Sequence, residues 1–174
     1  MRGFGSDNHS GVHPQIFSAM TLANIDHAPS YGTDEWSDRA IEMFKSHFGK
    51  QAEVFFVFNG TASNALAMRS LAKAYQSIFC SDLSHMNVDE CGAPEFFSGA
   101  KLVPLVSENG KISLETIKAA LIRRGDQHFS QPQVISLTQP TELGTCYSLK
   151  EIKEICQFAH QEKMTVHLDG ARFA

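Results

Sequence analysis

Short apolar runs alternate along this sequence with stretches whose apolar residues recur every three or four positions, and this alternation strongly limits the possible folds. The runs are rich in β-branched and aromatic residues and cover positions 54–58, 77–80, 101–106, 134–138 and 165–168. A repeated strand-then-helix order predicts a mostly parallel sheet with helices on both faces, a three-layer α/β/α fold. The run Val54–Phe58 is apolar throughout, so we expect a strand buried on both faces. Pro104 cannot donate to a sheet ladder and predicts that its strand lies at or near an edge.

The chain is interpreted as a single domain over residues 1–174, because it contains no repeat, low-complexity tract or linker. Residues 1–50 are expected to form an N-terminal arm and a helix, the helix running from Asp34 to Phe48. Residues 51–174 are expected to form the sheet and its helices. Ser113 and Ser148 are predicted helix N-caps, and Glu151 completes a capping box with Ser148.

The composition excludes several classes of function. With 174 residues, 43% hydrophobic and 20% charged, the chain resembles an ordinary globular protein. Its net charge of −4 and its scattered basic residues argue against nucleic-acid binding. The N-terminal residues contain no apolar h-region, so we expect no signal peptide, and no apolar run reaches the length of a membrane span. The four cysteines form no C-x-x-C pair and lack zinc-finger spacing with histidine, so we expect reduced thiols in a cytoplasmic protein. The histidines show no ligand spacing, so no metal site is predicted.

Polar residues follow the predicted strands, and ligands of parallel α/β sheets bind beyond the carboxyl ends of strands. Gly60 and Thr61 lead directly into a helix, where free N–H groups could hold a phosphate or could simply form a turn and cap. Asp169 ends the last strand and could face a metal, a ribose or a protonated ring nitrogen. It could equally form a structural pair with Arg172. His85 is a candidate functional residue or an ordinary loop histidine.

These features occur in an order that resembles the low-specificity L-threonine aldolases. The resemblance covers essentially the whole chain, and its sharpest parts are D-E-C-G-A-P-E-F-F and L-D-G-A-R-F-A. The matching stretches are 4–8, 31–34, 58–64, 85–97, 138–144 and 167–174. Members of that family are fold-type I enzymes that use pyridoxal 5'-phosphate (PLP) and cleave L-threonine or L-allo-threonine to glycine and acetaldehyde. The resemblance implies that the chain is part of the large, PLP-binding domain of such an enzyme.

The resemblance also implies roles for individual residues. Gly60 and Thr61 would hold the cofactor phosphate, His85 would stack on the pyridine ring, and Asp169 would pair with the ring nitrogen. Arg172 would bind the substrate carboxylate beside the cofactor. A buried carboxylate favours the protonated ring nitrogen, and the planar guanidinium suits a carboxylate.

Three further residues receive roles by the same resemblance. Ser6 would also contact the substrate carboxylate, and Tyr31 would lie close to the site, contributed by the same or a neighbouring subunit of a homo-oligomer, a dimer or tetramer. His128 would lie near the substrate hydroxyl, and with His85 it is a candidate catalytic base.

One part of the family pattern is missing. The lysine that forms the Schiff base with the cofactor follows the D-G-A-R motif in the family, whereas the last lysine of this sequence is Lys163. The sequence therefore predicts a truncated form that is inactive by itself. Two alternatives remain open: a non-catalytic truncated product or pseudo-enzyme, and a related PLP-dependent β-eliminating lyase.

Overall fold

Among the described residues, four parallel strands form one sheet in the computed structural model, which describes residues 3, 5 and 9–173. The strand order across the sheet is β2-β1-β3-β4. The strands are β1 (Gln76–Ser81), β2 (Lys101–Leu105), β3 (Gln131–Thr138) and β4 (Thr165–Asp169). Four of the five predicted strands are therefore confirmed. Pro104 lies in the edge strand β2, as its missing N–H predicts.

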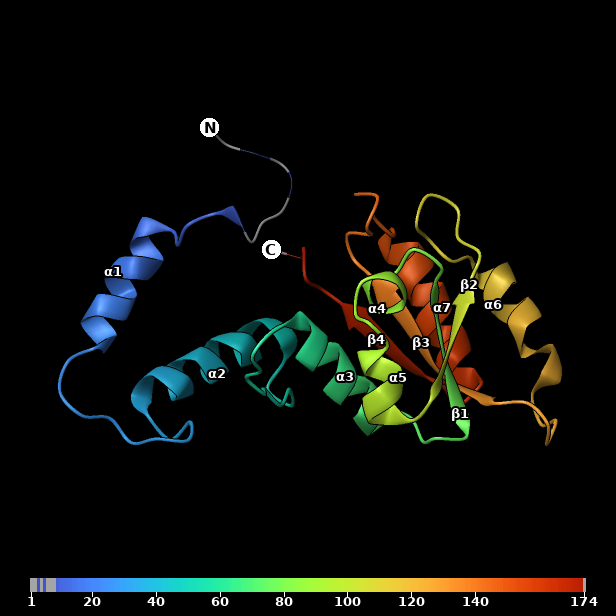
Figure 1. Cartoon of the computed structure of the whole chain (residues 1–174), viewed down its shortest axis with the longest axis horizontal. Coiled ribbons are helices and arrows are strands. Elements are labelled where there is room, and N and C mark those ends of the chain that lie inside the picture. The colour runs from blue at the N-terminus through green and yellow to red at the C-terminus, as the bar shows by residue number, and fades with distance from the viewer. Residues whose placement is uncertain (1–2, 4, 6–8, 174) are drawn as a thin grey trace. The chain divides into compact units, whose positions relative to one another are not determined.

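Helices cover both faces of this sheet, which confirms the predicted three-layer α/β arrangement (Figure 1). They are α3 (Gly60–Leu71), α4 (His85–Val88), α5 (Ala93–Ser98), α6 (Leu114–Ala120), the 3₁₀ helix η2 (Leu121–Arg123) and α7 (Leu149–Gln161). Side chains alternate along β1, so Phe79 packs in the core under α6 and α7, while Ile78 and Cys80 pack in the core under α3. Val134 and Ile135 divide β3 between the same two cores.

The helix ends follow the predicted caps. Ser113 accepts the Thr116 N–H at the start of α6, and Ser148 forms a reciprocal capping box with Glu151 at the start of α7. Each cap satisfies N–H groups that the first turn of a helix leaves without an intrahelical partner.

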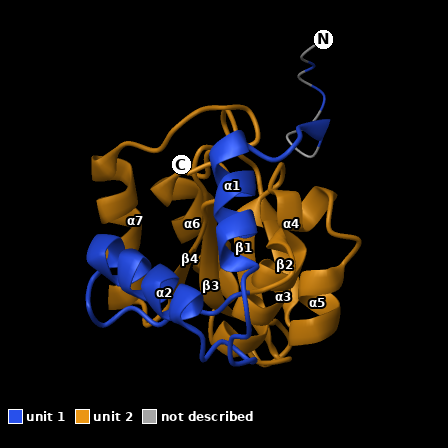
Figure 2. Ribbon diagram, turned by 90° about the vertical axis from the view of Figure 1, so that its left-hand side faces the viewer, with its two compact units in different colours: residues 1–56 blue, residues 57–174 orange. Residues whose placement is uncertain are grey.

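The chain divides into two compact units, residues 1–56 and residues 57–174 (Figure 2). The first unit contains α1 (Pro14–Ala23) and α2 (Glu35–Phe48), and α2 confirms the predicted helix. The Asp34 side chain caps α2 by accepting the backbone N–H and the hydroxyl of Ser37, and these bonds lower the pKa of the Asp34 carboxyl. The helix α1 was not anticipated from the sequence.

The prediction of a buried strand at Val54–Phe58 is wrong. The segment pairs with none of the four strands, and Phe55 and Phe58 are 79% and 96% exposed. An apolar run favours extended backbone, but a strand also needs a hydrogen-bonding partner, which the described part of the chain does not supply.

Candidate active site at the carboxyl ends of the strands

The parallel sheet brings three chain segments to one edge. Asp169 ends β4 and is paired in register with Thr138, the last residue of β3. The peptide Gln139–Pro140 follows β3 and is cis. His85 begins α4, shortly after β1 ends. Because β1, β3 and β4 are neighbours in the sheet, the polar groups that follow them meet at the same edge.

Asp169 is held through both of its carboxylate oxygens. Oδ1 accepts the Ala171 N–H at 3.0 Å, and Oδ2 accepts the side-chain amide of Asn64 at 3.1 Å. Asn64 is buried on α3, one helical turn after Gly60. These bonds join the carboxyl end of β4 to the first turns of α3 and fix the orientation of the Asp169 carboxylate.

His167 lies two residues before Asp169 and therefore faces the same side of β4. Its Nδ1 lies 2.9 Å from the Ser136 hydroxyl. Burial lowers the pKa of His167, although the charges of Asp169 and Glu90 oppose that shift. His167 is therefore neutral, so its ring forms no ion pair with Asp169, and the carboxylate remains available to a positively charged ligand group.

A second carboxylate, which is buried, lies beside His85. Glu90 Oε1 is 2.8 Å from His85 Nδ1 and accepts the Asn64 amide at 2.7 Å. The Glu90 side chain is fully buried, whereas 43% of the His85 side chain is exposed. Asn64 thus donates to both carboxylates, and one network includes His85, Glu90, Asn64 and Asp169.

Glu142 connects His85 to Arg172. Its Oε1 accepts the His85 backbone N–H at 3.0 Å and lies 3.4 Å from Arg172 Nη2. Arg172 Nε also donates to the Pro140 carbonyl at 3.3 Å. The guanidinium is held at the sheet edge yet remains partly exposed, so it can still reach an incoming anion.

The first turn of α3 presents unused donors. The Asn59 side chain caps the helix by accepting the Ala62 N–H at 2.8 Å, and Ser63 donates to the Asn59 carbonyl. The N–H groups of Gly60 and Thr61 have no acceptor within the described part of the chain. A Cβ added to Gly60 would meet open space, so the neighbouring volume could admit a ligand close to the backbone. These features fit an anionic group at the helix N-terminus.

The structure does not bring every predicted site residue to this edge. His128 precedes β3 and lies at its amino end, while Asp169 is level with its carboxyl end. An eight-residue strand spans about 23 Å, so His128 is far from Asp169 in this chain. Tyr31 belongs to the first unit and is exposed. Ser6 lies outside the described residues.

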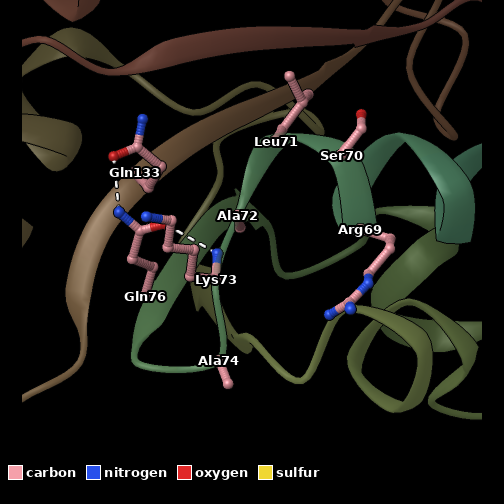
Figure 3. A pocket seen from close by; sticks show the side chains of 8 residues that line it. All are labelled: Arg69, Ser70, Leu71, Ala72, Lys73, Ala74, Gln76 and Gln133. Atoms are coloured by element: carbon pink, nitrogen blue, oxygen red, sulfur yellow. Dashed lines mark hydrogen bonds between the residues drawn. The ribbon is translucent and has the colours of Figure 1, made fainter.

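A surface hollow of about 590 Å³ occurs at the opposite edge of the sheet (Figure 3). It is lined by the end of α3, the loop that follows it and residues near the starts of β1 and β3, including Arg69, Lys73, Gln76 and Gln133. Gln76 accepts the Lys73 N–H and donates to Gln133, so its polar groups are already bonded within the chain. The hollow shares no residue with the Asp169 cluster.

Sequence reasoning gave no role to Asn64, Glu90 or Glu142. Asn64 and Glu90 lie within the stretches that carry the family resemblance, and Glu142 follows a strand end at the predicted ligand edge. The sequence could therefore indicate the region in which these residues lie. It could not indicate their contacts, since Asn64 and Glu90 are 26 positions apart in the chain, and Asn64 and Asp169 are 105 apart.

The fold and this cluster define an α/β protein whose polar side chains gather at the edge where such sheets bind ligands. The sequence profile of the beta-eliminating lyase family matches residues 3–174. The chain belongs to that family.

Several individual proteins are similar to this chain in sequence or in structure. A low-specificity L-threonine aldolase from Pseudomonas sp. is 45% identical over 98% of this chain, and its counterpart from Saccharomyces cerevisiae is 32% identical over 96%. A threonine aldolase structure from Leishmania major superposes with a TM-score of 0.90 at 27% identity, covering 94% of this chain and 48% of that one. An archaeal alanine:glyoxylate aminotransferase, 14% identical with a TM-score of 0.64, shares the fold.

The chain spans about half the length of the curated relatives that it matches, 50% of the Pseudomonas sp. protein and 43% of the yeast protein. Within the part that the structure describes, no helix is both long and apolar enough to cross a membrane.

Proposed function

We propose that the protein containing this chain is a PLP-dependent aldolase that cleaves L-threonine or L-allo-threonine to glycine and acetaldehyde. The observation that carries the proposal is the carboxylate of Asp169, oriented through both oxygens and joined by Asn64 to a helix with free N–H groups at its start. The similarity to low-specificity L-threonine aldolases over nearly the whole chain supports this reaction class.

The residues at the sheet edge suit the two polar ends of the cofactor. The N–H groups of Gly60 and Thr61 would hold the phosphate, with the Thr61 hydroxyl as a further donor. Asp169 would hold the proton on the pyridine nitrogen, and the His85 ring would stack on the pyridine face. When bound, PLP withdraws electrons from the α-carbon of an amino acid, which permits the bond between Cα and Cβ to break.

The remaining roles concern the substrate. Arg172 would bind the substrate carboxylate, and Glu142 would hold the guanidinium in place. Ser6 would add a donor to that carboxylate, and Tyr31 would contribute from the same or a neighbouring subunit. A histidine would accept the proton of the β-hydroxyl group; the candidates are His85, which lies at the sheet edge, and His128, which does not lie there within this chain.

The test uses the protein encoded by the complete gene. We expect L-threonine and L-allo-threonine to yield glycine and acetaldehyde in equal amounts, and the Asp169→Asn variant to lose at least about a hundredfold in kcat/KM, a loss of about 2.7 kcal/mol in transition-state stabilisation. Asp89→Asn, an exchange at an exposed aspartate between His85 and Glu90, is the matched control and should retain activity. Absence of both products from active-site-intact, PLP-loaded protein would overturn the proposal.

PLP-dependent β-elimination is the second candidate, since it is the reaction that the family is named for. The same assay separates the two, because β-elimination from threonine releases water and then gives 2-oxobutanoate and ammonia without glycine. A non-catalytic product would give neither pair.

We further propose a cytoplasmic homo-oligomer. All four cysteines are free, and apolar side chains such as Phe96 and Phe97 are 81% and 57% exposed on α5. Light scattering of the complete protein should show a dimer or tetramer; a monomer at micromolar concentration would contradict this assembly.

A further inference from the structure

Glu90 is a fully buried carboxylate at the centre of the network around His85. Its Oε1 contacts Asn64 Nδ2 at 2.7 Å and His85 Nδ1 at 2.8 Å. Its Oε2 is buried without a hydrogen-bond partner among the described residues. Burying a carboxylate is strongly unfavourable unless its neighbours compensate. A hydrophobic residue would fill this position at lower cost if packing were its only role.

The hydrogen positions in this network follow from the donors available. The Asn64 amide nitrogen can only donate, and it lies between Glu90 Oε1 and Asp169 Oδ2, so each carboxylate receives one of its two hydrogens. Glu90 Oε1 is therefore an acceptor. With Glu90 ionised, the side chain has no hydrogen to donate, so the contact with His85 is a hydrogen bond only if His85 Nδ1 carries a proton. In the neutral ring, Nε2 is consequently the unprotonated nitrogen.

We propose that Glu90 is a positioning residue that holds His85 as the Nδ1–H tautomer and, through Asn64, orients the Asp169 carboxylate. One buried side chain thereby sets the geometry of two groups from different parts of the chain. The consequence for the cofactor rests on the proposed function, because His85 and Asp169 are the residues assigned to the face and the nitrogen of the pyridine ring.

The arrangement has two physical effects on His85. The bond to Glu90 restricts rotation of a ring that is otherwise 43% exposed, and the Glu142 bond to the backbone N–H holds the start of α4. With its hydrogen on Nδ1, the ring also keeps Nε2 free to accept a proton. The adjacent carboxylate would stabilise the cation that results.

The first experiment measures the tautomer without using activity. Nitrogen NMR of the complete protein labelled with ¹⁵N-histidine, with His85→Asn to identify the His85 signals, should show the proton on Nδ1 in the wild type. Glu90→Gln keeps an acceptor oxygen and should preserve that pattern. Glu90→Ala should shift His85 to the Nε2–H form that an unconstrained neutral imidazole prefers. Glu95→Ala, which removes a nearby carboxylate bonded to the Leu102 N–H instead, should leave His85 unchanged.

The second experiment titrates the same proteins with PLP. We expect Glu90→Ala to weaken binding by roughly tenfold, Glu90→Gln by no more than about threefold, and Glu95→Ala not at all. Should Glu90→Ala fail to fold, Glu90→Met removes the acceptor while filling a similar volume.

The outcomes distinguish the two proposals. A His85 proton that stays on Nδ1 in the variants without an acceptor overturns the positioning role. So does PLP binding that is measurable and equally tight in all variants. If the His85 tautomer changes when Glu90 is replaced but the protein binds no PLP at all, the positioning role is supported and the proposed function is rejected.

Discussion

Replacing Asn64 by aspartate would place a third carboxyl group between two carboxylates. The Asn64 amide nitrogen lies 2.7 Å from Glu90 Oε1 and 3.1 Å from Asp169 Oδ2. In Asn64→Asp these contacts become oxygen to oxygen. Two unit charges about 3 Å apart repel by about 5 kcal/mol at an effective dielectric constant of about 20. Two such contacts would consume most of a typical folding free energy of about 5–15 kcal/mol. The new carboxyl group must therefore be protonated in the folded protein.

The need to keep the new carboxyl group protonated sets the size of the stability loss in Asn64→Asp and the direction of its pH dependence. An aspartate has a pKa of about 3.9 when unfolded, so keeping it protonated at pH 7 costs about 4 kcal/mol of unfolding free energy. The folded-state pKa of the new group is raised, so the folded variant binds more protons than the unfolded chain. Its stability accordingly falls as the pH rises above about 3.9, by up to about 1.4 kcal/mol per pH unit. At pH 5 this cost is only about 1.5 kcal/mol.

The assay is urea unfolding at several pH values between 5 and 8. Asn64→Ala removes both donated hydrogen bonds without adding a charge and should cost about 2–4 kcal/mol with no added pH slope. Asn87→Asp makes the same chemical exchange at an exposed residue whose amide donates to the Asp82 carbonyl, and should cost less than about 1 kcal/mol. If Asn64→Asp follows the pH dependence of the wild type, or loses less than about 1 kcal/mol at pH 7, the description of Asn64 as a donor to two charged carboxylates is wrong.

Three further predictions follow from local geometry. Hydrogen bonding to Lys111 first, and then to Ser148, lowers the pKa of Glu151 to about 2. The contribution of Glu151 to folding stability is therefore complete above the ordinary pKa of 4.5 and is lost as the pH falls toward 2. Because the side chain is exposed, urea unfolding should show a loss of only about 1–2 kcal/mol in Glu151→Ala and about 0.5 kcal/mol in Glu151→Gln, which keeps the bond to Ser148. Burial raises the pKa of Cys80 to about 11, so a thiol reagent should modify the exposed Cys91 and Cys146 in the native protein and reach Cys80 only on unfolding; rapid native reaction of Cys80 would contradict its burial. Gly110 has φ +80°, and an added Cβ would lie 2.8 Å from Thr141 Oγ1; Gly125 has φ +83°, but an added Cβ would meet open space. Gly110→Ala should therefore lower the melting temperature more than Gly125→Ala. Equal losses would show that the contact with Thr141 does not affect stability.

Local patterns predicted most of the secondary structure because their causes are local. Pro104 lacks an N–H and so marks an edge strand, and Ser148 with Glu151 satisfies the first turn of α7 whatever packs against it. The segment Val54–Phe58 shows the limit of such reasoning. Its composition favours extended backbone, but pairing depends on another strand, and residue order within the segment contains no information about that partner.

The sequence predicted where the candidate site would lie better than it predicted which side chains would form it. The rule that ligands bind beyond strand carboxyl ends predicts the edge at which His85, Glu142 and Asp169 gather, and Asp169 is the last residue of β4. The same rule could not show that Glu90 contacts His85, since that bond depends on how α4 turns after β1. It also could not exclude His128, which the family resemblance connects to the substrate but which precedes the amino end of β3.

The sheet order explains why this site can form from such distant segments. His85 follows β1, Glu142 follows β3 and Asp169 ends β4, and these three strands are adjacent and parallel. The pairing of Thr138 with Asp169 then sets how far β4 extends relative to β3. A shift of β4 by two residues would keep its side chains on the same faces but would move Asp169 by about 7 Å, beyond hydrogen-bonding reach of Asn64. The register of β3 and β4 therefore sets the geometry of this cluster, and the Asn64–Asp169 bond is both its result and one of the interactions that hold it.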